Sequence, residues 1–185
     1  MNYHNIVHDD FNNGDGIRVT LFESGCTHAC PGCHNQGTWD KNSGIPFDEA
    51  AKEELFEQLS QNYIDGITFS GGDPFAPFNR EETLALMKEI KEKFPNKTIW
   101  VYTGFTKEQL TMQGFWDNAK PFIDVLVDGR FVESLKSVSY EWAGSTNQRV
   151  LRKESDFTIN TSDKTEQKKE DVFVPEKCSC GDREL

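Results

Sequence analysis

Three cysteines lie within eight residues of the chain, in the segment Cys26-Thr-His-Ala-Cys30-Pro-Gly-Cys33. Spacings of three and then two intervening residues allow one loop to fold around a single inorganic centre. Thiolates are soft ligands that select soft or borderline metals, chiefly iron–sulfur clusters or zinc. A [4Fe–4S] cluster has four irons and this loop offers three sulfurs, which leaves one iron free to bind a small molecule. The spacing therefore favours a cluster that does chemistry.

Two other interpretations of this loop stay open. Zinc bound by three thiolates and one imidazole would use His28 or His34 as its fourth ligand, although structural zinc usually takes its ligands from two separated pairs. The thiols could also be free and merely packed, which is common for a single cysteine. Three cysteines in one polar loop with glycine and proline make a cluster with an open iron the favoured interpretation.

The residues around the cysteines suit a cage for a cluster. Such a loop keeps water and bulky side chains away from the sulfurs and donates backbone N–H groups to them. Gly25 and Gly32 permit close approach of the backbone. His34 and Asn35 follow Cys33 directly, so they are candidates for contact with a bound ligand. The alternative for these two is a polar pair that faces solvent.

A second glycine-rich segment, Gly71-Gly72-Asp73-Pro74, follows a predicted strand. Its bare backbone can receive a ligand's ammonium group on carbonyl oxygens, with the carboxylate of Asp73 nearby to balance the charge. A double glycine alone predicts only a turn between a strand and a helix. Thr103, at the end of another predicted strand, is placed for a ribose hydroxyl, with an ordinary turn as the alternative.

Hydrophobic patterning predicts the elements that position these segments. Runs of β-branched and aromatic residues predict four strands, and apolar residues at helical spacing predict helices between them. The predicted strands are 17–22, 66–70, 98–102 and 123–127, and the predicted helices are 48–62, 80–94 and a short one from residue 106. This alternation indicates a parallel sheet. Both loops, 23–46 and 71–78, then fall at the strand ends where α/β folds place ligands.

Three positions carry signals for the start of a helix. Asp48 is a good N-cap residue for the first helix. Asn79 with Glu82 gives the second helix a capping pattern, and Thr106 with Gln109 does the same for the third.

Composition bounds the class of protein. A chain of 185 residues with 36% hydrophobic residues suits one soluble domain, predicted at 1–152. Residues 153–185 are rich in charged and small polar residues, and we expect a mobile tail there. The net charge of -11 argues against nucleic acid as a partner, because phosphate binding relies on lysine and arginine.

The sequence also predicts a compartment. The first residues lack the pattern of a signal peptide, and no run approaches the ~20 apolar residues that span a bilayer. We therefore expect a cytoplasmic protein without membrane contact, in a compartment where thiols stay reduced. Five cysteines in two groups do not suggest a disulfide framework. Cys178 and Cys180, in the tail, are interpreted as exposed thiols with no settled role.

Together these motifs resemble a known family. The Cys-x3-Cys-x2-Cys segment followed by Gly-Gly-Asp-Pro is similar to the radical S-adenosylmethionine enzymes. Three further segments resemble the glycyl-radical-enzyme activases within that superfamily, namely 13–18, Ser24-Gly-Cys26 and Cys33-His-Asn35. Finer matches point to one branch of these activases: 37–39, 69–74, 125–131 and 144–149. The resemblance covers about residues 1–152.

The resemblance implies a fold and a set of ligands. The fold is an α/β, shortened and open (β/α) partial barrel of the radical S-adenosylmethionine type. Cys26, Cys30 and Cys33 would hold one [4Fe–4S] cluster per subunit, with the fourth iron chelated by S-adenosylmethionine. Segment 71–73 would receive the methionyl amine, and residues 32–35 would flank the cofactor. Many of these enzymes carry an aromatic residue where this chain has Gly32, so adenine stacking must come from elsewhere.

The resemblance also implies a reaction and partners. A reduced cluster would cleave S-adenosylmethionine, and the resulting radical would take hydrogen from a glycine of an anaerobic ribonucleoside-triphosphate reductase large subunit. An electron donor such as flavodoxin and a homodimer within a heterotetramer are expected with it. The alternatives are an activase for another glycyl radical enzyme, such as pyruvate formate-lyase, and a non-catalytic zinc-bearing interaction module.

Overall fold

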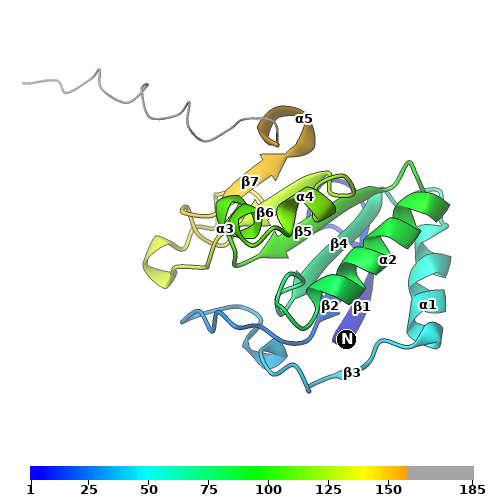
Figure 1. Cartoon of the computed structure of the whole chain (residues 1–185), viewed down its shortest axis with the longest axis horizontal. Coiled ribbons are helices and arrows are strands. Elements are labelled where there is room, and N and C mark those ends of the chain that lie inside the picture. The colour runs from blue at the N-terminus through cyan, green and yellow to red at the C-terminus, as the bar shows by residue number, and fades with distance from the viewer. Residues whose placement is uncertain (158–185) are drawn as a thin grey trace, which may run out of the picture.

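The computed structural model describes residues 1–157 of the chain. Its centre is one seven-stranded sheet with the order β3-β1-β2-β4-β5-β6-β7 (Figure 1). The strands are β1 Asn2–Asp10, β2 Arg18–Glu23, β3 Ile45–Pro46, β4 Gly66–Gly71, β5 Thr98–Thr103, β6 Val125–Asp128 and β7 Arg149–Arg152. The helices are α1 Glu49–Leu59, α2 Arg80–Lys93, α3 Lys107–Met112, α4 Trp116–Ala119 and α5 Lys153–Asp156, with short 3₁₀ turns η1 Gln36–Thr38 and η2 Glu133–Leu135.

The middle of the sheet is parallel, as the alternation of strands and helices predicts. Strands β2, β4, β5 and β6 pair in parallel register. Strands β1 and β7 pair antiparallel on either side of this group, and β3 pairs antiparallel with β1. The hydrophobic pattern of the sequence does not predict these three outer strands. The described sheet is open, since β3 and β7 stand at its two ends.

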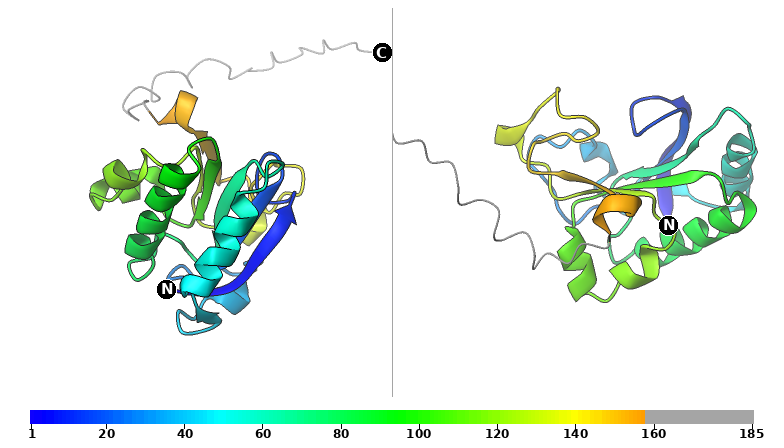
Figure 2. Two further views of the ribbon diagram at one scale, coloured as in Figure 1. Left: turned by 90° about the vertical axis from the view of Figure 1, so that its right-hand side faces the viewer. Right: turned by 90° about the horizontal axis from the view of Figure 1, so that it is seen from above.

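The two faces of the sheet are covered differently. Helices α1 to α4 lie on one face, while the segment after β6 lies on the other (Figure 2). The main apolar core forms under the helices, where every second strand residue points, as Ile99 and Val101 do in β5. Trp100, between them, belongs to a smaller cluster on the opposite face with Val125 and Val127. The face that α1 to α4 leave uncovered therefore has an apolar cluster of its own, centred on Trp100.

All three predicted helix starts are confirmed, and two of them have the predicted side-chain cap. The carboxylate of Asp48 accepts a hydrogen bond from the Ala51 backbone N–H at 3.0 Å. Thr106 and Gln109 form a complete capping box at the start of α3. Each bond satisfies a backbone donor that the first helical turn leaves without a partner.

The predicted capping role of Asn79 is wrong. Its side chain makes no bond to the first turn of α2. Instead, its amide donates to the backbone oxygens of Ser24 at 2.8 Å and Asp73 at 3.1 Å. Asn79 is buried, so it serves to hold two chain segments together rather than to cap a helix.

The opposite ends of the parallel strands, where β2 begins, hold a buried arginine. Arg18 is fully buried and donates to Thr68 Oγ1 at 2.8 Å and to the Ile67 oxygen at 2.7 Å. Its guanidinium lies 5.4 Å from the ring centre of Trp100, a cation–π distance. Burial lowers the pKa of Arg18 to about 10. Its many partners compensate the cost of taking the charge out of water.

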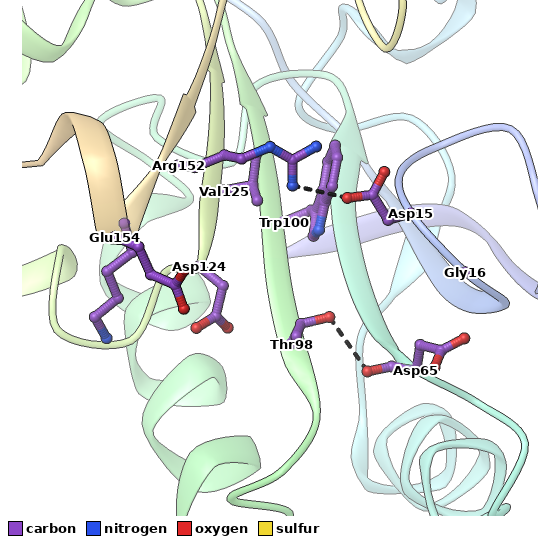
Figure 3. Close-up of a pocket in the computed structure, with 10 residues that line it drawn as sticks. Asp15, Gly16, Asp65, Thr98, Trp100, Asp124, Val125, Arg152 and Glu154 are labelled. Carbon is purple, nitrogen blue, oxygen red and sulfur yellow. Dashed lines mark hydrogen bonds and ion pairs between the residues drawn. The ribbon is translucent and has the colours of Figure 1, made fainter.

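A cavity of about 430 Å³ opens at this same end of the sheet (Figure 3). Trp100 lies in its wall, and Arg152 stands over the tryptophan ring at 5.4 Å. The polar groups around the cavity are bonded to one another, as Arg152 is to Asp15 at 2.7 Å and the Thr98 hydroxyl is to the Asp65 oxygen at 3.2 Å. The cavity lies at the edge of the sheet opposite to the cysteine loop, and these four polar residues of its lining already have partners.

The first residues of the expected tail are ordered against the domain. Residues 153–156 form α5, and the Phe157 ring packs edge-on against Trp116 with ring centres 4.9 Å apart. The rest of the tail, including Cys178 and Cys180, lies outside the described residues. Among residues 1–157, no helix is both long enough and apolar enough to cross a membrane.

Glu23, the last residue of β2, is a buried acid. Burial is the largest cause that raises its pKa, to about 8. Thr83 Oγ1 lies 3.0 Å from both carboxyl oxygens and 3.2 Å from the Asn79 backbone oxygen. Since the hydroxyl has one hydrogen, all three groups are satisfied when neutral Glu23 donates to Thr83 and Thr83 donates to Asn79. The neutral acid therefore fits this site.

We expect Glu23→Gln to flatten the dependence of stability on pH. The folded state keeps the Glu23 proton up to about pH 8, whereas the unfolded chain loses it near 4.5. The contribution of Glu23 to the free energy of unfolding is therefore fully present below pH 4.5 and is lost as the pH rises to 8. The neutral amide avoids this loss, which these two pKa values put at about 4 kcal/mol at pH 8.

Urea unfolding of the two proteins between pH 5 and 8.5 measures this effect. The control is Glu53→Gln, because Glu53 is exposed on α1. If the free energy of unfolding changed with pH in the same way in wild type and Glu23→Gln, the buried acid would not titrate as described.

Candidate functional site

The cysteine loop leaves the end of β2 and is closed on itself by backbone bonds. The N–H groups of Gly25 and Cys26 donate to the oxygens of Thr38 at 2.6 Å and Trp39 at 2.9 Å. Within the loop, the Cys33 N–H donates to the Cys30 oxygen at 3.1 Å. Both ends of the three-cysteine segment are therefore anchored. The Cys26 end is bonded to Trp39, next to η1, and the Cys33 end is held by a local turn.

The three thiols are reduced and differ in exposure. Cys30 is buried, whereas Cys26 and Cys33 are partly exposed. Burial raises the pKa of the Cys26 thiol, and the N–H of His28, 3.4 Å from the sulfur, opposes that rise. Within residues 1–157, no three Cys, His, Asp or Glu side chains already converge as a finished metal site.

The donor set fits an iron–sulfur cluster. Three thiols on one anchored loop supply the soft ligands that such clusters take. Coordination deprotonates a thiol outright, so the raised pKa of Cys26 is no obstacle, although binding then releases protons. Cys26, Cys30 and Cys33 are the residues that would hold the cluster.

The Gly71–Pro74 turn lies directly against the cysteine loop, as the order of the strands predicts. The Asp73 N–H donates to the Gly25 oxygen at 2.8 Å, and the Gly72 N–H donates to the Glu23 oxygen at 2.8 Å. A Cβ on Gly72 would lie 2.4 Å from the Gly25 oxygen, and Gly71 has a φ of +97°. Glycine is required at both positions, because a side chain would push the two backbones apart.

The carboxylate of Asp73 is fully buried and faces inward. One oxygen accepts from the Phe75 N–H at 2.9 Å and from the Thr103 hydroxyl at 2.8 Å. The other accepts from the Gly104 N–H at 3.0 Å. Asp73 and Thr103 therefore bond to each other here. Their contacts with a bound cofactor, expected from the sequence, stay predictions.

The remaining predicted site residues occupy the outer part of the loop. His34 is exposed, and the Asn35 backbone oxygen accepts from both the N–H and the hydroxyl of Thr38, at 3.0 and 2.8 Å. Gly32 has a φ of +71°, and a Cβ there would lie 2.8 Å from the carboxyl group of Glu133. Gly32 thus permits the segment after β6 to cover the loop. Its role toward a cofactor stays a prediction.

That segment, residues 129–148, forms a wall beside the cysteine loop that the sequence pattern does not predict. Gln148 holds its backbone, accepting from the Gly144 N–H at 3.0 Å and donating to the Gly129 oxygen at 2.9 Å. Asn147 donates to the Arg130 oxygen at 2.8 Å. The Arg130 guanidinium in turn donates to the backbone oxygen of His28. Gln148 and Asn147 belong to the 144–149 motif, which marks the family resemblance. The motif does not reveal that these two side chains hold the wall together.

Arg149, at the start of β7, neutralises a buried aspartate. It donates to Asp128 Oδ1 at 2.9 Å and to Glu108 Oε2 at 2.7 Å, while Asp128 is 1% exposed. The hydrogen bond from Arg149 lowers the pKa of Glu108 to about 2. Asp128 also accepts from the Lys107 N–H at 2.7 Å. This ion-pair network joins the end of β6 and the start of β7 to the start of α3.

Arg149→Gln is expected to destabilise the protein by about 2 kcal/mol. Removing one member of a buried ion pair usually costs ~3–5 kcal/mol, and the partial exposure of Arg149 reduces that figure. Thermal unfolding at pH 7 measures the change. Lys120→Gln breaks the exposed pair with Asp117 and should cost about 0.5 kcal/mol or less. Equal losses in the two variants would contradict a special role for Arg149.

Comparison with known proteins gives one family model and several close relatives. The model is described as a 4Fe-4S single cluster domain and matches residues 12–151. A protein of Escherichia coli K12, named anaerobic ribonucleoside-triphosphate reductase-activating protein, is 45% identical over 152 residues, 81% of this chain and 97% of the relative. Proteins with the same name are 42% identical in Haemophilus influenzae, over 82% of this chain and 98% of the relative, and 41% identical in Enterobacteria phage T4, over 81% and 93%.

Proposed function

The chain belongs to the family of anaerobic ribonucleoside-triphosphate reductase-activating proteins, and we propose that it generates a glycyl radical on the large subunit of that reductase. Under this proposal it is a radical S-adenosylmethionine enzyme with one [4Fe–4S] cluster per subunit. Its substrate is a glycine in the backbone of another protein.

One observation carries the proposal, namely the direct backbone contact between the cysteine loop and the Gly71–Pro74 turn. The Asp73 N–H donates to the Gly25 oxygen, one residue before Cys26. A cluster-binding loop and a glycine-rich ligand-binding turn thus share one edge of the sheet. This arrangement supports a site in which a cluster and a small molecule lie side by side.

The residues divide into three tasks in this proposal. Cys26, Cys30 and Cys33 hold the cluster, and the backbone of 71–73 receives the amine of S-adenosylmethionine. When bound and reduced, the cluster supplies the electron that cleaves S-adenosylmethionine and so yields the radical that takes a hydrogen atom from the glycine. The buried carboxylate of Asp73 holds the turn in place by accepting hydrogen bonds from Thr103 and Gly104 at the end of β5.

We propose further that the sheet forms a shortened, open partial barrel of the radical S-adenosylmethionine type. The placement of α1 to α4 on one face supports this idea, because helices surround the outside of such barrels. The helix-free face would then be the inside. An open side would admit the glycine loop of the reductase.

The proposal includes partners and a compartment. An electron donor of the flavodoxin kind would reduce the cluster, and a homodimer would dock the larger reductase subunit. The reaction would take place in the cytoplasm. The family resemblance supports these parts of the proposal.

Electron paramagnetic resonance tests the proposal directly. The purified, reconstituted protein is incubated without oxygen with a reductant, S-adenosylmethionine and the reductase large subunit. We expect an organic radical signal in the larger protein, and none when Cys30→Ala replaces the wild type. Pyruvate formate-lyase serves as the second substrate. A signal only on that enzyme would redirect the assignment, and a colourless protein that carries zinc would overturn it.

A further inference from the structure

Three loops that follow neighbouring strands meet at the carboxylate of Asp73. The turn after β4 contains Asp73 itself, and the loop after β5 contributes Thr103 and Gly104. The loop after β2 contributes His28, whose Nε2 lies 2.8 Å from Asp73 Oδ2. The buried carboxylate is thus a common point of attachment for the ends of three strands.

The His28 ring is enclosed at this junction. Its side chain is 11% exposed, and that of Asp73 is 1% exposed. The ring packs edge-on against Phe105 with ring centres 4.5 Å apart, and Gly104 leaves it space, since a Cβ there would lie 2.3 Å from the ring. The approach of Nε2 to the carboxylate is close but lacks the alignment of a hydrogen bond. The packing of the ring thus holds Nε2 close to the carboxylate.

The backbone of His28 also contacts the thiol of Cys26 and the wall formed by residues 129–148. Its N–H donates to the Cys26 sulfur at 3.4 Å, and its oxygen accepts from the Arg130 guanidinium. The next residue, Ala29, has a φ of +45°, an unusual conformation for a residue with a side chain. The loop is therefore fixed around His28 from several directions, and the side chain supplies its link to the turn after β4.

We propose that His28 is a positioning residue that fixes the cysteine loop against the Gly71–Pro74 turn through Asp73. The cofactor role of this contact rests on the function proposed above. His28 is directed at a carboxylate of the fold, so it acts as a link between the two halves of the site rather than as a fourth metal ligand. Loss of the link should loosen both loops while the sheet beneath them stays folded.

Two substitutions separate the polar link from packing. His28→Phe keeps a ring against Phe105 and Gly104 but removes the contact with Asp73. His28→Gln keeps a donor that can reach the carboxylate. His8→Asn is the matched control, because His8 pairs with Glu54 at 2.9 Å on the exposed surface of α1 and β1.

Hydrogen–deuterium exchange of the protein without a cluster tests the link independently of activity. The amides of Asp73 and Gly104 report on the junction. We expect about tenfold faster exchange at both in His28→Phe, wild-type exchange in His28→Gln and His8→Asn, and unchanged exchange within α2 in all variants. Wild-type exchange at both amides in His28→Phe would overturn the proposal. So would equally fast exchange in α2, since it would show general destabilisation.

The reconstituted enzyme gives the second readout. We expect His28→Phe to bind a normal amount of iron but to show a KM for S-adenosylmethionine raised about tenfold, with kcat changed less, and His28→Gln to restore the KM. A fall in kcat at constant KM would contradict a positioning role. If wild type itself fails to cleave S-adenosylmethionine, the proposed function fails, while the exchange experiment still decides the structural link.

Discussion

Alanine at Cys26, Cys30 or Cys33 is expected to abolish iron binding after anaerobic reconstitution, and with it all cleavage of S-adenosylmethionine. Each thiol lies on the same loop, and the described residues offer no finished metal site that could substitute for one of them. Loss of one of three protein ligands leaves a cluster with two open irons, which is unstable in water. Iron content per chain and the brown colour of the protein are the measurements.

The tail supplies the matched control for this experiment. Cys178→Ala and Cys180→Ala change a thiol of the same chain beyond the matched segment 12–151. Both variants should bind as much iron as wild type. Full iron content and cleavage in any one of the three loop variants would remove that cysteine from the site. Loss of iron in the tail variants would bring the tail into it.

Gly72→Val is expected to leave the iron content unchanged and to weaken S-adenosylmethionine binding at least about 100-fold, or about 2.7 kcal/mol. A Cβ at this position would lie 2.4 Å from the Gly25 oxygen, so the turn must move away from the cysteine loop. S-adenosylmethionine could then no longer contact the backbone of residues 71–73 and the cluster at the same time. Isothermal titration with the reconstituted protein measures the affinity.

Gly37→Val is the control for the glycine experiment. Gly37 lies in the same long loop, yet a Cβ there meets no atom within 4 Å. Binding should stay within about twofold of wild type. An unchanged affinity in Gly72→Val, or an equal loss in Gly37→Val, would show that the contact between the two loops does not govern cofactor binding.

The meeting of these two loops was predictable from the sequence because it follows from topology. The runs at 66–70 and 98–102 contain β-branched and aromatic residues typical of strands, and the helix between them has clear periodicity. Parallel strands place their carboxyl ends at one edge of a sheet. The cysteines and the double glycine each follow such a strand, so their proximity required no knowledge of side-chain contacts.

The outer strands were not predictable in the same way. Strand β1 contains His4, Asn5 and His8 and alternates irregularly between buried and exposed positions, with two breaks in its pairing with β2. Its strand conformation depends on backbone bonds to residues far along the chain. Local propensity does not report such pairing.

Polar side chains that connect distant segments were also hidden from the sequence. Asn79 stands three residues before Glu82, as a capping residue would, but Ser24 and Asp73 provide better partners for a buried amide. Asp73 likewise follows a glycine pair, as a ligand-facing acid would, yet its carboxylate binds Thr103. In both residues a long-range bond decides where the side chain points, and no local pattern carries that information.

The two ends of β2 serve separate purposes, and this separation matters for engineering. Arg18 begins the strand beside Trp100, and Glu23 ends it three residues before Cys26. At ~3.3 Å per residue, the five steps from the first to the last residue of this six-residue strand place its ends about 16 Å apart. Free-energy changes at sites this distant usually add. Substitutions that raise thermal tolerance around Trp100 can therefore be combined with changes in substrate chemistry at the cysteine edge without a trade-off between them.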